Sequence, residues 1–157
     1  MLDQINGLPV HALVLHAAVI FVPLLAAVAI VYALISPWRP RIGWALVLLA
    51  VAAPLCALVA KLSGEKLFDR LKARGMSGRG VEILNDHMRF GTMTVWFSVA
   101  LGVVSLIMVL ATLRRSASLP RAADLGLGVV MIALAAISGY YVFRTGDSGA
   151  TAVWGSY

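Results

Sequence analysis

Charged residues and cysteines are scarce in this sequence. Only 13% of its 157 residues are charged, whereas 61% are hydrophobic, and soluble domains contain about 25% charged residues. Cys56 is the only cysteine, so neither a disulfide within the chain nor a cysteine-based metal cluster can form. A nucleophile elbow, a phosphate-binding glycine loop and an HExxH pair are also absent. These absences argue against an enzyme of the hydrolase, kinase or nucleotide-binding type, and the excess of apolar residues indicates a protein that lies in lipid.

Basic residues outnumber acidic ones, 13 Lys and Arg against 7 Asp and Glu, which gives a net charge of +6. The basic residues lie beside apolar stretches and do not form a basic domain interleaved with aromatic side chains. Cations in such flanking positions are typical of membrane proteins. The lipid bilayer is therefore the expected partner, and nucleic acid is not.

Four apolar stretches of membrane-spanning length follow one another. They cover about residues 11–35, 42–62, 90–113 and 125–143. About 20 residues of helix cross a hydrocarbon core about 30 Å thick, so each stretch is expected to be a transmembrane helix. Short connections make the helices that they join antiparallel neighbours. The sequence therefore predicts an all-α integral membrane protein, a single domain over residues 1–157 in which four transmembrane helices form an up-down-up-down bundle.

The segments after the second and fourth stretches carry signals of their own. Ser63 is expected to cap a short amphipathic helix at the membrane interface, between the second and third spans. The apolar face of this helix is formed by Leu67, Phe68 and Leu71, and glycines then break it. The C-terminal tail, residues 144–157, is expected to be rich in turns and to dock back on the bundle or on an interface.

The distribution of basic residues indicates an orientation. The side that holds both termini and the 63–89 loop carries eight Lys and Arg, and the other side carries five. However, no basic residue precedes the first span, whereas Arg39 and Arg41 follow it directly, and charges near the first helix usually dominate. Both termini are therefore predicted to lie outside. The N-terminus has no basic n-region and no small-residue cleavage site, so the first span is expected to be retained.

The three histidines gather toward one membrane face. His11 and His16 lie in the opening of the first span, and His87 lies just before the third. A titratable side chain at the edge of the apolar region is costly, which makes each of them a candidate for function. His11 and His16 are separated by roughly 140° around a helix, so both cannot face one partner.

Several roles remain open for these histidines. His16 and His87 could approach a planar ligand from opposite sides, as the two axial ligands of haem b do. A small metal site would use His11, His16, His87 and Asp86, although their spacing matches no recognised ligand motif. The alternatives without a cofactor are hydrogen bonds to loop carbonyls or to Asp86, and a proton relay.

Several short segments resemble a bacterial membrane family, the family of domain of unknown function 2231. The segments are GLPVHALVLH at residues 7–16, LSG at 62–64, HMRFG at 87–91 and GATAVWG at 149–155. Ala12 stands where the family usually has a proline. The resemblance implies four spans, a location in the bacterial inner membrane and, because relatives are sometimes linked to Rieske or c-type cytochrome modules, a respiratory setting.

These observations favour a non-catalytic accessory subunit of a bacterial membrane complex, plausibly a respiratory one, which packs against other transmembrane subunits or against itself. No cofactor is required for that role. The alternative is a haem b-binding electron-transfer protein with His16 and His87 as ligands. A small transporter or channel is a second alternative, but the spans contain few polar residues to line a pathway and show no inverted repeat.

Overall fold

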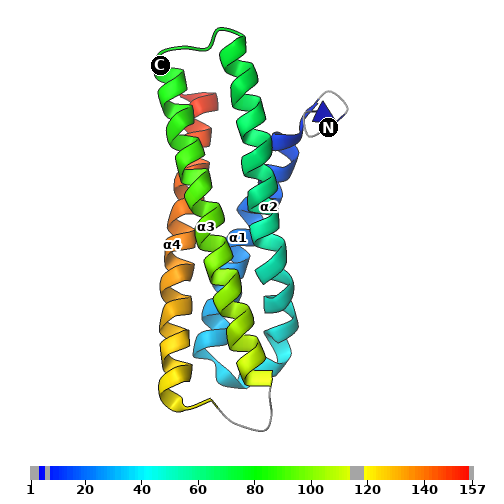
Figure 1. The fold of residues 1–157 in the computed structure, drawn as a ribbon, viewed down its shortest axis with the longest axis vertical. Coiled ribbons are helices and arrows are strands. Elements are labelled where there is room, and N and C mark those ends of the chain that lie inside the picture. The colour runs from blue at the N-terminus through cyan, green and yellow to red at the C-terminus, as the bar shows by residue number, and fades with distance from the viewer. Residues whose placement is uncertain (1–3, 6–7, 114–118, 156–157) are drawn as a thin grey trace.

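The computed structural model describes residues 4–5, 8–113 and 119–155, and within them the chain is a bundle of four long helices (Figure 1). These are α1 (Val10–Leu34), α2 (Arg39–Ala73), α3 (Arg79–Leu113) and α4 (Arg121–Trp154). A short antiparallel pair, β1 (Gln4–Ile5) and β2 (Leu8–Pro9), precedes α1, and the 3-10 turn η1 (Ser36–Trp38) joins α1 to α2. Consecutive helices run in opposite directions (Figure 1). The predicted all-α, up-down-up-down bundle is confirmed.

The helices are arranged so that α1 and α3 lie on one diagonal of the bundle. Helix α1 packs along α2 and α4, and α3 packs along the same two helices. All four are long and apolar enough to cross a membrane. Helices α2 and α3, at 35 residues each, are about 52 Å long, against a hydrocarbon core of about 30 Å. The part of these helices that exceeds the hydrocarbon thickness contains the charged residues near the α2–α3 turn. This end of the bundle therefore projects beyond the hydrocarbon.

The predicted separate interfacial helix is wrong. Residues 63–73 are the last turns of α2. Ser63 does not cap a helix, because its hydroxyl donates to the carbonyl oxygens of Val59, at 2.8 Å, and Ala60, at 3.0 Å, within α2. The helix ends only at the turn that contains Gly75 and Gly78, whose φ angles of +93° and +64° suit glycine.

The predicted turn-rich tail is also wrong over residues 144–154, which continue α4. Residues 156–157 lie outside the described part of the chain. Polar side chains in this segment bond to their own helix instead of opening turns: Ser148 donates to the carbonyl oxygen of Arg144 at 2.8 Å, and Thr151 to that of Asp147 at 2.9 Å. Packing against α3 thus outweighs the weak helix propensity of Gly146 and Gly149.

The end of the bundle opposite the α2–α3 turn is tied together by Arg39. Its guanidinium donates to the carbonyl oxygens of Tyr32, at 2.9 Å, and Ala33, at 3.1 Å, and forms an ion pair with Asp124 at 2.7 Å. The Tyr32 hydroxyl in turn shares a 2.7 Å hydrogen bond with Thr112. These bonds join the ends of all four helices and set their register.

Helices α2 and α3 cross closely at Gly102, which is buried. A Cβ atom there would lie 2.5 Å from the carbonyl oxygen of Ala50. Small residues permit such approaches in membranes, where apolar burial alone gives no drive for helix association. The contact is with backbone, so no side-chain rotation can relieve it.

Gly102→Ala is therefore expected to destabilise the bundle by about 1–3 kcal/mol, the usual cost of forcing extra volume into a packed interior. Thermal unfolding in detergent measures the effect. Gly139→Ala is the matched control, because no atom lies within 4 Å of a Cβ at that position. Equal melting temperatures for the two variants would contradict the close crossing.

Candidate functional site

A pair of histidines from the diagonal helices meets near the projecting end of the bundle. The ring centroids of His11, in the first turn of α1, and His87, in α3, are 6.2 Å apart, with an interplanar angle of 89°. The rest of the contact between α1 and α3 is slight. The structure thus brings together His11 and His87, whereas the sequence predicted His16 and His87.

His11 is held against α2 by one hydrogen bond and one glycine. Its Nδ1 lies 2.9 Å from the carbonyl oxygen of Ala60. A carbonyl oxygen only accepts, so Nδ1 carries the proton and donates it. The imidazole lies flat on Gly64, where a Cβ atom would come within 3.0 Å of the His11 Cε1. Ser63 Oγ, 3.5 Å from Nδ1, completes the surroundings.

His87 is held against α4 in the same way. Its Nδ1 donates to the carbonyl oxygen of Thr145 at 2.9 Å and lies 3.2 Å from Ser148 Oγ. A Cβ at Gly149 would come within 2.9 Å of the His87 Cε1. In both halves the helix offers a carbonyl oxygen, a serine three residues later and a glycine four residues later. In both, the serine hydroxyl also donates to the carbonyl oxygen that accepts the histidine bond.

Within the described residues, this arrangement leaves the same atom, Nε2, without a hydrogen bond on each ring. Since Nδ1 is the protonated nitrogen, a neutral imidazole has its lone pair on Nε2. A hydrogen bond from the other ring nitrogen to a backbone carbonyl is the usual way in which a protein orients a histidine that binds a metal. The site therefore presents two oriented nitrogen donors.

The other predicted site residues lie elsewhere. His16 is exposed, and its Nδ1 is 2.8 Å from the carbonyl oxygen of Ala12, in its own helix. Asp86 is exposed. Among the described residues, no group of three or more His, Cys, Asp or Glu side chains is placed to hold a metal ion. The four residues of the predicted small metal site do not form such a group.

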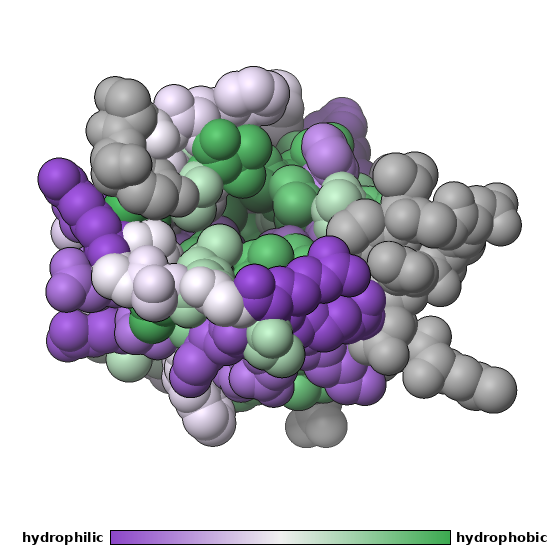
Figure 2. Space-filling model, turned by 90° about the horizontal axis from the view of Figure 1, so that it is seen from above, coloured by the Kyte–Doolittle hydropathy of each residue, from purple (hydrophilic) through white to green (hydrophobic). Residues whose placement is uncertain are grey.

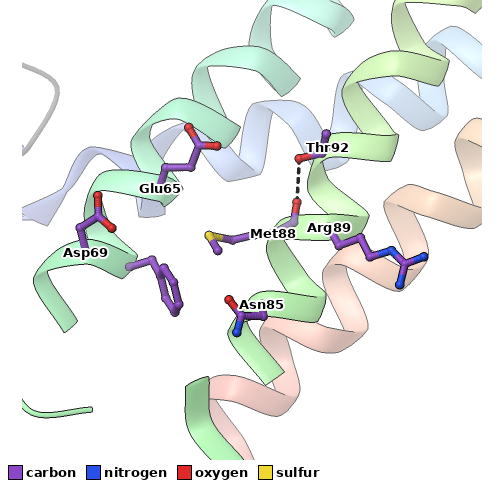
Figure 3. Close-up of a pocket in the computed structure, with 7 residues that line it drawn as sticks. Glu65, Asp69, Asn85, Met88, Arg89 and Thr92 are labelled. Atoms are coloured by element: carbon purple, nitrogen blue, oxygen red, sulfur yellow. Dashed lines mark hydrogen bonds between the residues drawn. The ribbon is translucent and has the colours of Figure 1, made fainter. Parts of the chain in front are cut away.

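Two grooves lie between the helices toward this end of the bundle, and neither His11 nor His87 lines them. One, of about 560 Å³, runs between α2 and α3 past Met88, with Glu65 and Asp69 on its α2 side (Figure 3). The other, of about 490 Å³, lies between α1 and α4 beside Gly146 and is largely apolar. Seen from above, the projecting end is hollowed, with hydrophobic residues inside and hydrophilic ones around them (Figure 2). The surroundings suit an amphipathic ligand.

These features define a multi-pass membrane protein of four helices with an oriented histidine pair at one end. The chain belongs to the family described as predicted membrane protein (DUF2231), whose model matches residues 7–156. The match includes both histidines and both serine-glycine units, and it confirms the resemblance seen in the sequence. No curated protein and no solved structure matches the chain.

Proposed function

We propose that the protein binds haem b through His11 and His87 and carries single electrons within the membrane. The separation of the two rings supports this proposal. A metal about 2.0 Å from each of two Nε2 atoms sets the ring centroids roughly 6 Å apart, and the observed distance is 6.2 Å. The ligand pair differs from the one predicted from the sequence, because His11 takes the place of His16.

The number of protein donors favours haem over a bare ion. A structural zinc ion needs four protein ligands, and the described residues offer two at this site. Haem brings four nitrogens of its own, so two histidines complete its coordination. If His11 and His87 both ligated the haem iron, the iron would have no position left for a substrate, and the group would supply electron transfer instead of catalysis.

The visible spectrum of the purified protein tests the proposal. Protein produced with added haem precursor is expected to show a Soret band and, on reduction with dithionite, the sharp α band of six-coordinate haem. One haem per chain is the expected stoichiometry. Protein that stays colourless after titration with haemin would contradict the proposal, and the histidine pair would then serve only to join helices.

A carrier with a single haem needs an electron donor and an electron acceptor, so we propose that the protein works as a subunit of a larger, respiratory membrane assembly. The projecting end supports this role, because α2, α3 and α4 offer contact surface beyond the hydrocarbon. Extraction in mild detergent should leave the chain in a complex with a subunit that contains haem or iron–sulfur. Migration as an isolated 16.7 kDa chain would contradict the role.

We also propose that the protein lies in a bacterial inner membrane with the α2–α3 turn outside. Ser36, in η1 before α2, and Ser77, between α2 and α3, are both exposed, and the 35-residue helix α2 separates them. In a Cys56→Ser background, Ser77→Cys is expected to react in intact cells with a maleimide that cannot cross membranes, and Ser36→Cys only after lysis. The reverse pattern would contradict the orientation, and equal labelling of both positions would contradict a spanning bundle.

A further inference from the structure

In the part of the chain that the structure describes, the Arg144 side chain, next to the histidine site, has no hydrogen-bond or ion-pair partner. It precedes Thr145, whose carbonyl oxygen binds His87. The Arg144 Nε atom is buried, and no hydrogen bond reaches it. Two ion pairs are present in the described part of the chain, Arg39–Asp124 and Lys61–Glu65, and neither includes Arg144.

The position of Arg144 corresponds to the edge of the hydrocarbon. Helix α4 begins at Arg121, and the 23 residues from there to Arg144 cover about 35 Å, close to the thickness of the apolar core. A guanidinium at this depth is costly unless an anion or water satisfies it. Among the described residues, the contact recorded for the guanidinium is with the ring of Phe90, whose centroid lies 4.8 Å from the Arg144 Cζ.

Stacking on Phe90 prepares Arg144 for an anion. The face of an aromatic ring attracts the flat face of the guanidinium. The N–H groups, which lie along the edges of the guanidinium, then remain free to donate hydrogen bonds. Those edges match the two oxygens of a carboxylate or phosphate, and Arg binds such groups with paired hydrogen bonds. The buried Nε belongs to one of these edges, so an oxyanion bound there would satisfy the atom that the protein leaves unbonded.

We propose that Arg144 binds the oxyanion of an amphipathic ligand at the membrane boundary beside His87. Two sources have this chemistry, the phosphate of an anionic phospholipid and a propionate carboxylate of haem. Only the propionate source rests on the proposed haem function. Arg144 precedes Thr145 in α4, and the carbonyl oxygen of Thr145 orients His87. The proposed oxyanion site and the histidine site therefore share one turn of helix.

Arg144→Gln tests the inference, with Arg89→Gln as the matched control. Arg89 is exposed at the same end of the bundle, and its guanidinium points away from Glu65 and Asp69 (Figure 3). The first experiment compares thermal unfolding of haem-free protein in detergent with added phosphatidylglycerol or phosphatidylcholine of equal chain length. If the site binds phospholipid, phosphatidylglycerol should raise the melting temperature of the wild type and of Arg89→Gln more than phosphatidylcholine does. In Arg144→Gln, the two lipids should raise the melting temperature equally.

The second experiment titrates haem and haem dimethyl ester, in which both propionates are blocked. For a propionate site, the wild type and Arg89→Gln should bind the ester at least about tenfold more weakly than haem, and Arg144→Gln should bind the two alike with both histidines still ligating. If Arg144→Gln behaves as the wild type in both experiments, the inference is wrong. A chain that binds no haem but loses its lipid preference in Arg144→Gln would refute the haem proposal and support the anion site.

Discussion

Replacing His87 by alanine is expected to abolish the absorption of six-coordinate haem, and replacing His11 should do the same. In the proposed site each ring would provide one nitrogen ligand to the haem, and in the structure the Nδ1 atom of each ring is held by a carbonyl oxygen at 2.9 Å. Loss of either should lower haem affinity by at least about 100-fold, because metal sites lose 10–100-fold even when only an outer partner is removed. Haemin titration followed in the Soret region measures the affinity.

His16→Ala is the control for this experiment. His16 is the same residue type in the same helix as His11, but it is exposed and bonds to its own backbone. Its loss should leave the spectrum unchanged. Free imidazole should restore part of the band in His11→Ala and His87→Ala, because it can occupy the space left by the missing ring. Loss of the band in His16→Ala with retention in His11→Ala would instead favour the pair predicted from the sequence.

The choice between His11 and His16 as the partner of His87 shows what the sequence alone does not decide. The five-residue spacing of His11 and His16 excludes a common direction for the two rings, but it does not say which ring faces the bundle. That choice depends on Gly64, which leaves room for the ring of His11, and on the carbonyl oxygen of Ala60. Both belong to another helix. Serine-glycine pairs occur at 63–64 and 148–149, but also at 77–78 and 138–139, so the sequence does not show which of these pairs face a histidine.

The helix ends were missed for a related reason. Apolar runs predicted the four spans well, since hydropathy reports the part of a helix that lies in hydrocarbon. It does not report where the helix stops, and α2 continues from the apolar run into a charged segment up to Ala73. Charge ended the apolar pattern at about residue 62, but glycines with positive φ end the helix at 75–78. A helix that leaves the membrane without bending has no distinct signal at the boundary.

Gly149→Ala is expected to weaken haem binding by about 10- to 100-fold, the range found when the partners that orient a metal ligand are disturbed. The added Cβ would lie 2.9 Å from the His87 Cε1 and 3.2 Å from its Nδ1. The ring must therefore move away from α4, which stretches its bond to the carbonyl oxygen of Thr145 and changes the direction of Nε2, the atom that would bind the haem iron. The substitution changes no ligand, so its effect isolates the orientation of His87.

Gly126→Ala is the matched control, because no atom lies within 4 Å of a Cβ at Gly126 and this residue lines neither groove. Both substitutions lie in α4 and replace glycine by alanine, so both should gain about the same helix propensity. Any difference in haem affinity between them then comes from the contact with His87. Gly64→Ala should weaken binding as well, since its Cβ would meet the His11 ring at 3.0 Å. If Gly149→Ala and Gly126→Ala bind haem equally, the glycine does not position the ligand, and His87 is oriented by the Thr145 carbonyl alone.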